Sequence, residues 1–335
     1  MPTFSIVIPF YNTEYEFYKK TFACLKDIPE SVAEVLVIDD GSDCAAYQEL
    51  ERYLHSEIPT AKLFRQENGG QNMARQYGLE RAEGDYVFFL DSDDYLEPSL
   101  LIELGRFLEK RSPDVVAFNY DIVSPEGRRL ESCELWRSGF SEIGLSELVL
   151  TSDSLCRQCY SLKKIKNLNY GLVQGIRIGE DLSSSMSINL ALSDCWSFGG
   201  VLYHYVKRPT SIIHNAPSGS AFDIFVAFDE VLSRCGAECN GCRCEVEWMA
   251  ILHCLGWNSI RLLRAGADPH EAKERTFQWM QDNFPEWKQN KYVRTEPVAR
   301  KLWFRLASSG CWNTLAVGVS IWDKIKTMVH RELHD

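Results

Sequence analysis

The stretch that decides the fold is Tyr86-Val87-Phe88-Phe89-Leu90-Asp91-Ser92-Asp93-Asp94, where an apolar run ends abruptly in acidic residues. Successive large apolar residues, preceded by Gly84-Asp85, predict a strand buried on both faces of a parallel sheet. Open α/β sheets bind ligands at the carboxyl ends of such strands. Because one residue separates Asp91 from Asp93, their carboxylates can converge on one hard cation, which suits a nucleotide diphosphate.

The acidic end of this run has a second interpretation. Ser92 or Asp94 could instead cap a helix that begins near Pro98, which would make the acids an ordinary loop. The rest of the chain decides between the two interpretations.

Strands and helices alternate before the central run. The expected strands cover 4–10, 34–38 and 62–64, and the expected helices cover 14–27, 45–55 and 71–82. Strict alternation of this kind predicts an α/β fold with a mostly parallel sheet and right-handed crossovers.

The second half of the chain predicts further α/β structure followed by helices alone. After a helix at 98–110 we expect a strand at 114–118, a hairpin within 122–131, helices at 141–155 and 182–191, a short connecting element at 160–165 and a last strand at 196–206. Small polar residues around 215–220 predict a domain boundary, with an α/β domain over 1–214 and a helical region over 215–335. The amphipathic helices expected there cover 222–233, 245–265, 270–283, 299–307 and 315–332.

Composition narrows the classes of partner. The 335 residues include 36 Lys plus Arg against 47 Asp plus Glu, a net charge of −11 that argues against nucleic acid as the main partner. No window reaches the roughly 18 uninterrupted apolar residues that a spanning helix needs, and no basic region precedes the first strand. We therefore expect a cytoplasmic protein whose twelve cysteines are reduced thiols.

Two more strand ends carry residues suited to a nucleoside. The first strand ends at Pro9-Phe10-Tyr11, and the second ends in Asp39-Asp40. A base can stack on Tyr11 while Asp39 or Asp40 accepts hydrogen bonds from its edge or from a ribose. The alternatives are a packed strand-end aromatic for Tyr11 and a turn with Gly41-Ser42 for the acids.

Five segments in order resemble the motif set of the family-two inverting glycosyltransferases of GT-A (Rossmann-like) fold. The resemblance spans about residues 3–213 and rests on Phe4–Asn12, Val37–Ser42, Asn68–Arg75, Asp91–Asp94 and Gly179–Asp181. Gln71 and Gln76 depart from the residues common in that family, which leaves details of donor contact open.

The resemblance implies a donor site. The residues expected to hold the nucleotide-sugar are Pro9, Tyr11, Asp39, Asp40, Asn68, Gly69, Ala74, Arg75, Asp91, Ser92 and Asp94, with Asp39 on the base and Asp94 facing the sugar. Asp93 and Asp91 are expected to bind Mg²⁺ or Mn²⁺, with Asp93 as the direct ligand.

The resemblance also implies a catalytic pair. Glu180-Asp181 follows a glycine at an expected helix start, and an inverting transfer needs one base to take the acceptor's proton. Asp181 is the expected base, and an ordinary helix cap is the alternative.

A basic segment after the last strand resembles the loop that closes over the pyrophosphate. Lys207 and Arg208 could offset charge on the leaving diphosphate, and His204 could be a further metal ligand. For His204 a packed or surface position is an equal alternative.

Two features of the second half stay open. Cys235, Cys239, Cys242 and Cys244 are expected to be free thiols, with zinc as the alternative and an iron–sulfur cluster as a weaker one. The segments 301–304 and 317–329 mix aromatic, apolar and basic residues, which suits either core packing or an amphipathic helix lying on the inner face of a membrane.

The resulting hypothesis is a metal-dependent inverting glycosyltransferase that takes sugar from a nucleotide-diphosphate donor, UDP-linked, to a hydroxyl of a saccharide or lipid-linked acceptor, in assembly of a surface polysaccharide or glycolipid. The alternatives are a sugar-phosphate nucleotidyltransferase, which needs a glycine-rich basic loop that Phe10–Thr13 lacks, and a non-catalytic relative that binds sugar nucleotide.

Overall fold

The computed structural model describes residues 2–26, 28–208, 218–236 and 238–332. Contacts divide the chain into two compact units, Met1–Gly175 with Glu180–Ser211, and Ile176–Gly179 with Ile212–Asp335. The expected boundary at 214/215 lies outside the described residues. None of the helices built from the described residues is both long and apolar enough to cross a lipid bilayer.

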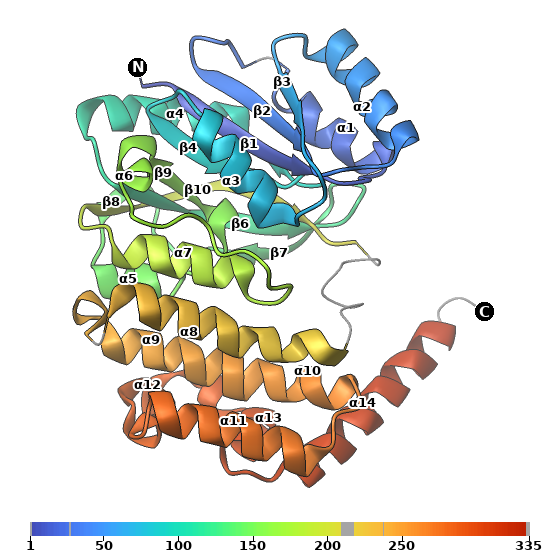
Figure 1. The fold of residues 1–335 in the computed structure, drawn as a ribbon, viewed down its shortest axis with the longest axis vertical. Coiled ribbons are helices and arrows are strands. Elements are labelled where there is room, and N and C mark those ends of the chain that lie inside the picture. The colour runs from blue at the N-terminus through green and yellow to red at the C-terminus, as the bar shows by residue number, and fades with distance from the viewer. Residues whose placement is uncertain (1, 27, 209–217, 237, 333–335) are drawn as a thin grey trace. The chain divides into compact units, whose positions relative to one another are not determined.

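The first unit is built on one mixed sheet (Figure 1). Its described strands are β1 (Phe4–Phe10), β2 (Ala33–Asp39), β3 (Lys62–Arg65), β4 (Tyr86–Phe89), β5 (Tyr95–Leu96), β6 (Val115–Val123), β7 (Arg129–Cys133), β8 (Phe140–Glu142), β9 (Gln158–Ser161) and β10 (Cys195–Val206). The main path runs β3-β2-β1-β4-β9-β6-β10-β5.

Most of the longer strands run in one direction. β1 pairs parallel with β2 and β4, β2 with β3, and β6 with β10. β9 is inserted antiparallel between β4 and β6, so β6 and β10 run the same way as β1 to β4. The predicted α/β class with a mostly parallel sheet is confirmed, and β5, β7, β8 and β9 are its antiparallel additions.

Burial explains the strands at the centre. Every residue of β1 and β4 is buried, as their continuous apolar runs predict for strands covered on both faces. Edge strand β3 is partly exposed and begins and ends in a basic residue.

Seven α-helices are described in the first unit, namely α1 (Tyr15–Ala23), α2 (Cys44–Glu57), α3 (Gln71–Arg81), α4 (Pro98–Lys110), α5 (Leu145–Val149), α6 (Leu162–Lys166) and α7 (Glu180–Leu190). Helix α3 packs closely on β1 and β2 because Gly78 has no side chain. A Cβ there would lie 2.4 Å from Val7 Cγ1 and 3.2 Å from Ile38 Cγ1. This close packing fixes the position of the helix that carries Arg75.

The predicted helix at 141–155 is wrong. Ser141 and Glu142 belong to β8, which pairs with β10, and only the five residues of α5 are α-helical. Thr151 and Ser152 hydroxyls donate to the Leu148 carbonyl at 2.9 and 2.8 Å, an alternative to continuing the helix.

The second unit is helical. Its described α-helices are α8 (Asp223–Cys235), α9 (Arg243–Ala250), α10 (Asn258–Arg264), α11 (Pro269–Asn283), α12 (Lys291–Thr295), α13 (Leu302–Ser308) and α14 (Trp312–Glu332). A π-helical segment, Ile251–Trp257, separates α9 from α10, and a 3₁₀ turn, Pro297–Arg300, precedes α13. The helices predicted at 245–265 and 299–307 are therefore both interrupted.

Candidate active site

The ends of β1 and β2 form the first wall of the site. Phe10 lies opposite Asp39 in the parallel register, so Tyr11 and Asn12 follow beside the turn after β2. The Asn12 backbone N–H donates to Ser42 Oγ at 2.9 Å. Tyr11 is 53% exposed, which leaves its ring available to a stacked base, whereas Pro9 lies inside the buried strand.

Asp39 is buried at this edge. Its Oδ1 accepts from the Ser42 N–H at 3.3 Å, and its Oδ2 lies 3.2 Å from Arg65 Nε. Arg65 in turn lies over the Tyr47 ring, 4.4 Å from the centroid. A base could reach Asp39 only where these partners leave its oxygens accessible, so its nucleoside contact stays a prediction.

Asp40 holds the loop that leads into α3. Its carboxylate accepts from Gln66 Nε2 at 2.8 Å, from the Gly69 N–H at 2.9 Å and from the Gly70 N–H at 2.8 Å. The Asn68 amide donates to the Asp40 carbonyl at 2.9 Å. The structure thus gives Asp40 a positioning role, and Asn68 and Gly69 sit exposed on the loop that it anchors.

Arg75 is the fully buried centre of the site. Its guanidinium donates to Asp91 Oδ1 at 2.5 Å and to Asp181 Oδ1, and it lies 3.7 Å from Cys156 Sγ. Burial disfavours its charge, but Asp181 and Asp91 outweigh that cost and raise its pKa further. One cation therefore brings the acid at the end of β4 together with the acid that opens α7, while Ala74 is buried beside it.

Asn72, also on α3, ties this helix to Val173 and to the first turns of α7. Its side-chain nitrogen donates to the Val173 carbonyl at 2.9 Å, to Ser184 Oγ at 3.0 Å and to the Glu180 carbonyl at 3.2 Å. Its oxygen accepts from Arg75 at 2.9 Å. Asn72 is buried, so it fixes the first turn of α7 against α3.

The acids after β4 have different environments. Asp93 pairs with Arg208, whereas Asp94 is buried and accepts from Tyr203 Oη at 2.5 Å and from the Val206 N–H at 2.7 Å. Ser92 contacts Thr13, with 2.6 Å between the hydroxyl oxygens. The expected contact of Asp94 with a sugar stays a prediction, since both of its oxygens already hold β10.

The donor chemistry at Asp91 and Asp93 fits a divalent cation. Burial, followed by repulsion from Asp91, raises the pKa of Asp93 to about 6 although Arg208 lowers it. A hard cation would relieve that repulsion, and a diphosphate could complete its oxygen shell. Within the described ranges, no three His, Cys, Asp or Glu side chains converge to hold a metal by themselves.

His204 belongs to no metal-binding group among the described residues. It stacks on Tyr95 with 4.6 Å between ring centroids, and its buried Nδ1 finds no hydrogen-bond partner in the described part of the chain. Burial lowers its pKa and so favours the neutral imidazole. Its role as a metal ligand stays a prediction.

Glu180 and Asp181 open α7, as the sequence predicted. Burial, followed by repulsion from Asp181, raises the pKa of Glu180 to about 7. Burial also raises the pKa of Asp181, while Arg75 opposes that shift. Both carboxylates at this helix start are therefore stronger bases than an ordinary exposed carboxylate.

Comparison with known proteins finds a family that this chain resembles. Residues 5–166 match the family model of glycosyl transferase family 2. Over this segment the chain is similar to glycosyl transferase family 2.

Individual glycosyltransferases are similar to part of the chain. An uncharacterized glycosyltransferase of Haemophilus influenzae is 30% identical over 131 residues, covering 39% of this chain and 52% of that protein. TarS of Staphylococcus aureus, a poly(ribitol-phosphate) beta-N-acetylglucosaminyltransferase, is 30% identical over 128 residues, covering 38% of this chain and 22% of TarS. The alignments therefore span about half or less of those relatives.

Solved structures of similar fold cover more of the chain. TarS 1–349 of S. aureus in complex with UDP-GlcNAc matches 96% of this chain and 92% of its own, with a TM-score of 0.72 at 18% identity. The mannosyltransferase PcManGT of Pyrobaculum calidifontis, in complex with GDP-Man and Mn²⁺, matches 96% and 88% with a TM-score of 0.56 at 14% identity. These likenesses show that the fold is similar over nearly the whole chain, including residues of the helical unit.

Two residues of this site were not predicted from the sequence. Asn72 lies inside the Asn68–Arg75 motif, where its position beside Arg75 was the available signal. Tyr203, the partner of Asp94, lies more than a hundred positions from it and had no local signal.

The cysteine and C-terminal predictions concern the helical unit. Cys235, Cys239, Cys242 and Cys244 are free thiols, and they form no group able to hold a metal in the part of the unit that is described. On α14 the side chains of Val317, Ile321 and Trp322 are exposed. Membrane contact through this helix stays a prediction.

Proposed function

We propose that this protein is an inverting glycosyltransferase that takes sugar from a UDP-linked donor to an acceptor hydroxyl with the help of a divalent cation. The observation that carries the proposal is the buried Arg75, which holds the β4 acid Asp91 and the α7 acid Asp181 on one guanidinium. Direct displacement needs the groups that bind the donor and the base on the acceptor side to be held at a fixed distance from each other. The ion pairs of Arg75 with Asp91 and Asp181 support such an arrangement.

Each side chain then has one task. Asp181 takes the acceptor proton as the hydroxyl attacks the anomeric carbon, and Arg75 fixes the orientation of its carboxylate. Asp91 and Asp93 would hold Mg²⁺ or Mn²⁺, which when bound offsets charge on the departing diphosphate. Arg208 lies beside Asp93 and adds a positive charge on that side.

The names of similar proteins suggest the substrate class. TarS acts on poly(ribitol-phosphate), and GgaB of Bacillus subtilis, 27% identical over 219 residues and matched over 23% of its length, is a minor teichoic acid biosynthesis protein. We infer a hydroxyl-bearing surface polymer or its lipid-linked precursor as the acceptor, and a cytoplasmic place of action.

Titration calorimetry with UDP tests the cation site. We expect affinity to rise with Mn²⁺ or Mg²⁺ and to fall in EDTA, since Asp91 and Asp93 alone repel a diphosphate. Asp93→Ala should remove the cation-dependent increment, whereas Asp39→Ala should weaken UDP binding with or without metal. The exposed Asp85, which holds Thr3, provides the control substitution Asp85→Ala. Equal affinity in EDTA would contradict the metal role.

A panel of nucleotide-sugars then separates enzyme from non-catalytic relative. Cation-dependent hydrolysis of one UDP-sugar, with the first-formed anomer inverted in NMR spectra, would support the proposed chemistry. Tight binding of every donor with no turnover, in the presence of acceptor polymers, would favour the binding-only alternative. Formation of nucleotide-sugar from sugar phosphate would favour a nucleotidyltransferase.

A further inference from the structure

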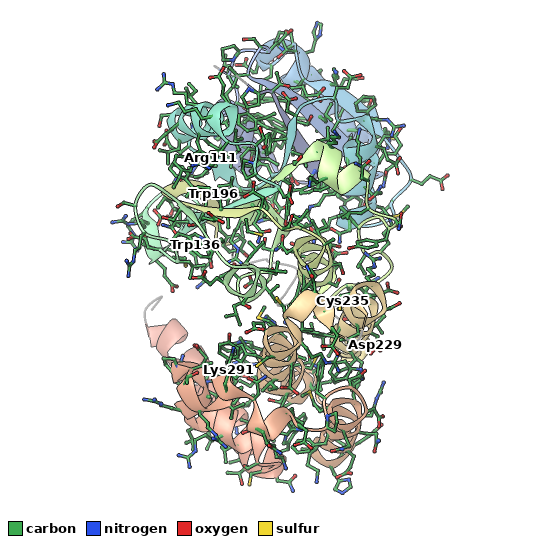
Figure 2. The ribbon with its side chains drawn as sticks, turned by 90° about the vertical axis from the view of Figure 1, so that its left-hand side faces the viewer. Arg111, Trp136, Trp196, Asp229, Cys235 and Lys291 are labelled. Carbon is green, nitrogen blue, oxygen red and sulfur yellow. The ribbon has the colours of Figure 1, made fainter. Side chains whose placement is uncertain are left out.

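Two cysteine sulfurs of the helical unit lie almost within bonding distance. Cys235 is the last residue of α8, and Cys239 begins a 3₁₀ turn, Cys239–Gly241. Their Sγ atoms are 2.7 Å apart, against about 2.05 Å in a disulfide. Figure 2 labels Cys235 and shows sulfur in yellow. Oxidation would therefore need only a small movement of either side chain.

The backbone after α8 brings these sulfurs together. Gly236 has a φ of +69°, which ends the helix, and its carbonyl accepts from the Cys239 N–H at 3.3 Å. Cys239 itself has a φ of +44°, an uncommon conformation for a residue with a side chain. These two conformations end α8 and turn the chain so that the Cys239 sulfur lies against that of Cys235.

The surroundings favour ionisation of one thiol. The hydrogen bond from Cys235 and the nearby Arg243 lower the pKa of Cys239 to about 7, although burial opposes this. The Arg243 guanidinium is held in place by the Asn283 carbonyl at 2.5 Å and by the Phe284 ring, 4.4 Å from its centroid. A substantial fraction of Cys239 is thus thiolate at neutral pH, the form that reacts with disulfides.

We propose that Cys235 and Cys239 form a redox-active dithiol that converts reversibly to an intramolecular disulfide by exchange with a low-molecular-weight disulfide. Cys235 is partly exposed and Cys239 is fully buried, so the reagent meets Cys235 first. Cys235 passes its thiol proton along their hydrogen bond to the Cys239 thiolate as it attacks one reagent sulfur, and the other half of the reagent leaves as a thiolate that takes up this proton. Cys239 thiolate then attacks Cys235 Sγ in the mixed disulfide and releases the second half as a thiol. Two protein thiols are oxidised and one reagent disulfide is reduced to two thiols.

Treatment of the 335-residue chain with oxidised glutathione tests the proposal. After acid quenching and alkylation, trypsin releases Cys235–Arg243, a peptide that contains Cys235, Cys239 and Cys242. We expect mass spectrometry to show this peptide with two hydrogens lost and one alkyl group, on Cys242. Reduction with dithiothreitol should restore three alkyl groups.

Matched variants make the outcome specific. Cys242→Ser should still form the disulfide, whereas Cys239→Ser should stop at a glutathione adduct on Cys235. The exposed Cys44 and Cys311 report how far glutathione has reacted in the same sample. The proposal is overturned if Cys235 and Cys239 stay fully alkylated while Cys44 is fully modified, or if Cys242 takes part in the bond.

Discussion

Arg75 shows how a single buried cation organises a site. It is 0% exposed, and it survives burial because two carboxylates from different elements compensate its charge. Its Nε has no hydrogen-bond partner in the described part of the chain, so all of its pairing lies on the two terminal nitrogens. Removing either acid therefore changes both charge balance and geometry.

Asp181→Asn separates the base from the structural partner. We expect transfer to fall by about 10²–10⁴-fold with UDP affinity retained, because the amide keeps the shape but cannot accept the acceptor proton. Melting temperature should also drop slightly, since Arg75 keeps only Asp91 as a charged partner. Transfer rate, UDP affinity and melting temperature are measured on the same preparation.

Asp114→Asn is the matched control for that substitution. Asp114 is also buried, and its carboxylate accepts from Ser193 and Asp194 backbone N–H groups, outside the site. It should lower stability and leave turnover unchanged. An unchanged transfer rate in Asp181→Asn would remove Asp181 from the mechanism and direct attention to Glu180.

Glu180 gives a prediction about pH and stability. Its pKa of about 7, raised mainly by burial, lies above the value of about 4.3 in the unfolded chain. The folded state therefore binds this proton more tightly than the unfolded state does. The stability that this proton adds to the fold is fully present below about pH 4.3 and is lost as pH rises through 7.

Glu180→Gln should remove that loss. We expect the free energy of unfolding of the variant at pH 8 to exceed that of wild type by on the order of 1 kcal/mol, after discounting for partial exposure. This difference should vanish near pH 4. Thermal unfolding across pH 4–8 measures it, with the exposed Glu103→Gln on α4 as control. A difference independent of pH would argue against the raised pKa.

Among elements, α3 and α7 are joined through two buried side chains of α3, Asn72 and Arg75. The helix start that presents Glu180 and Asp181 is held to α3 by hydrogen bonds from one amide, which also accepts from Arg75. The register of α7 against the sheet thus depends on a buried polar contact, for which distance and direction both matter.

Asn72→Ala should impair turnover more than donor binding. It removes the amide that donates to the Val173 and Glu180 carbonyls, which costs about 1–3 kcal/mol of stability, and it frees Asp181 to move. We expect kcat to fall at least tenfold with a smaller change in KM for the donor. Steady-state kinetics and thermal unfolding check this, with the exposed Glu80→Ala on the same helix as control. If kcat returns to the wild-type value at low temperature, where the variant is folded, Asn72 only supports folding.

At the scale of the whole molecule, two separate sets of buried residues support the two units. The main core of the first unit runs from β1 to β10. The helical unit buries its own aromatics, among them Trp248, whose ring lies 5.9 Å from Tyr292 and 6.1 Å from Phe304. Each unit therefore has enough apolar burial to unfold as a cooperative element.

Trp248→Ala should destabilise the helical unit alone. Truncating a buried tryptophan costs about 3–5 kcal/mol, so we expect one calorimetric transition to move down while UDP affinity, measured below it, is unchanged. Phe88→Ala, in the core of the first unit, should instead lower both that unit's transition and UDP affinity. If both variants show one unfolding transition and both lose UDP affinity, the two units do not unfold independently.

The sequence by itself determined the α/β class, the strands that end at the site and the order of its acidic motifs. These features depend on local periodicity and on residues adjacent in the chain, such as the run Tyr86–Leu90 followed by Asp91. The sequence also placed Glu180 and Asp181 at the start of a helix. It failed at 141–155, where pairing with β10 and hydroxyl bonds to the backbone override an apparently helical pattern.

Only the tertiary structure decided which of these residues meet. Arg75 and Asp181 are 106 positions apart, and Asp94 and Tyr203 are 109 apart, so no local pattern connects them. Their contacts follow from β9 entering antiparallel between β4 and β6 and from α3 packing on β1 through Gly78. The spacing of Cys235 and Cys239 was visible in the chain, but their contact required a positive φ at Gly236 and Cys239. Periodicity reports which face of an element is buried, whereas partners are chosen by how elements pack, which depends on the whole chain.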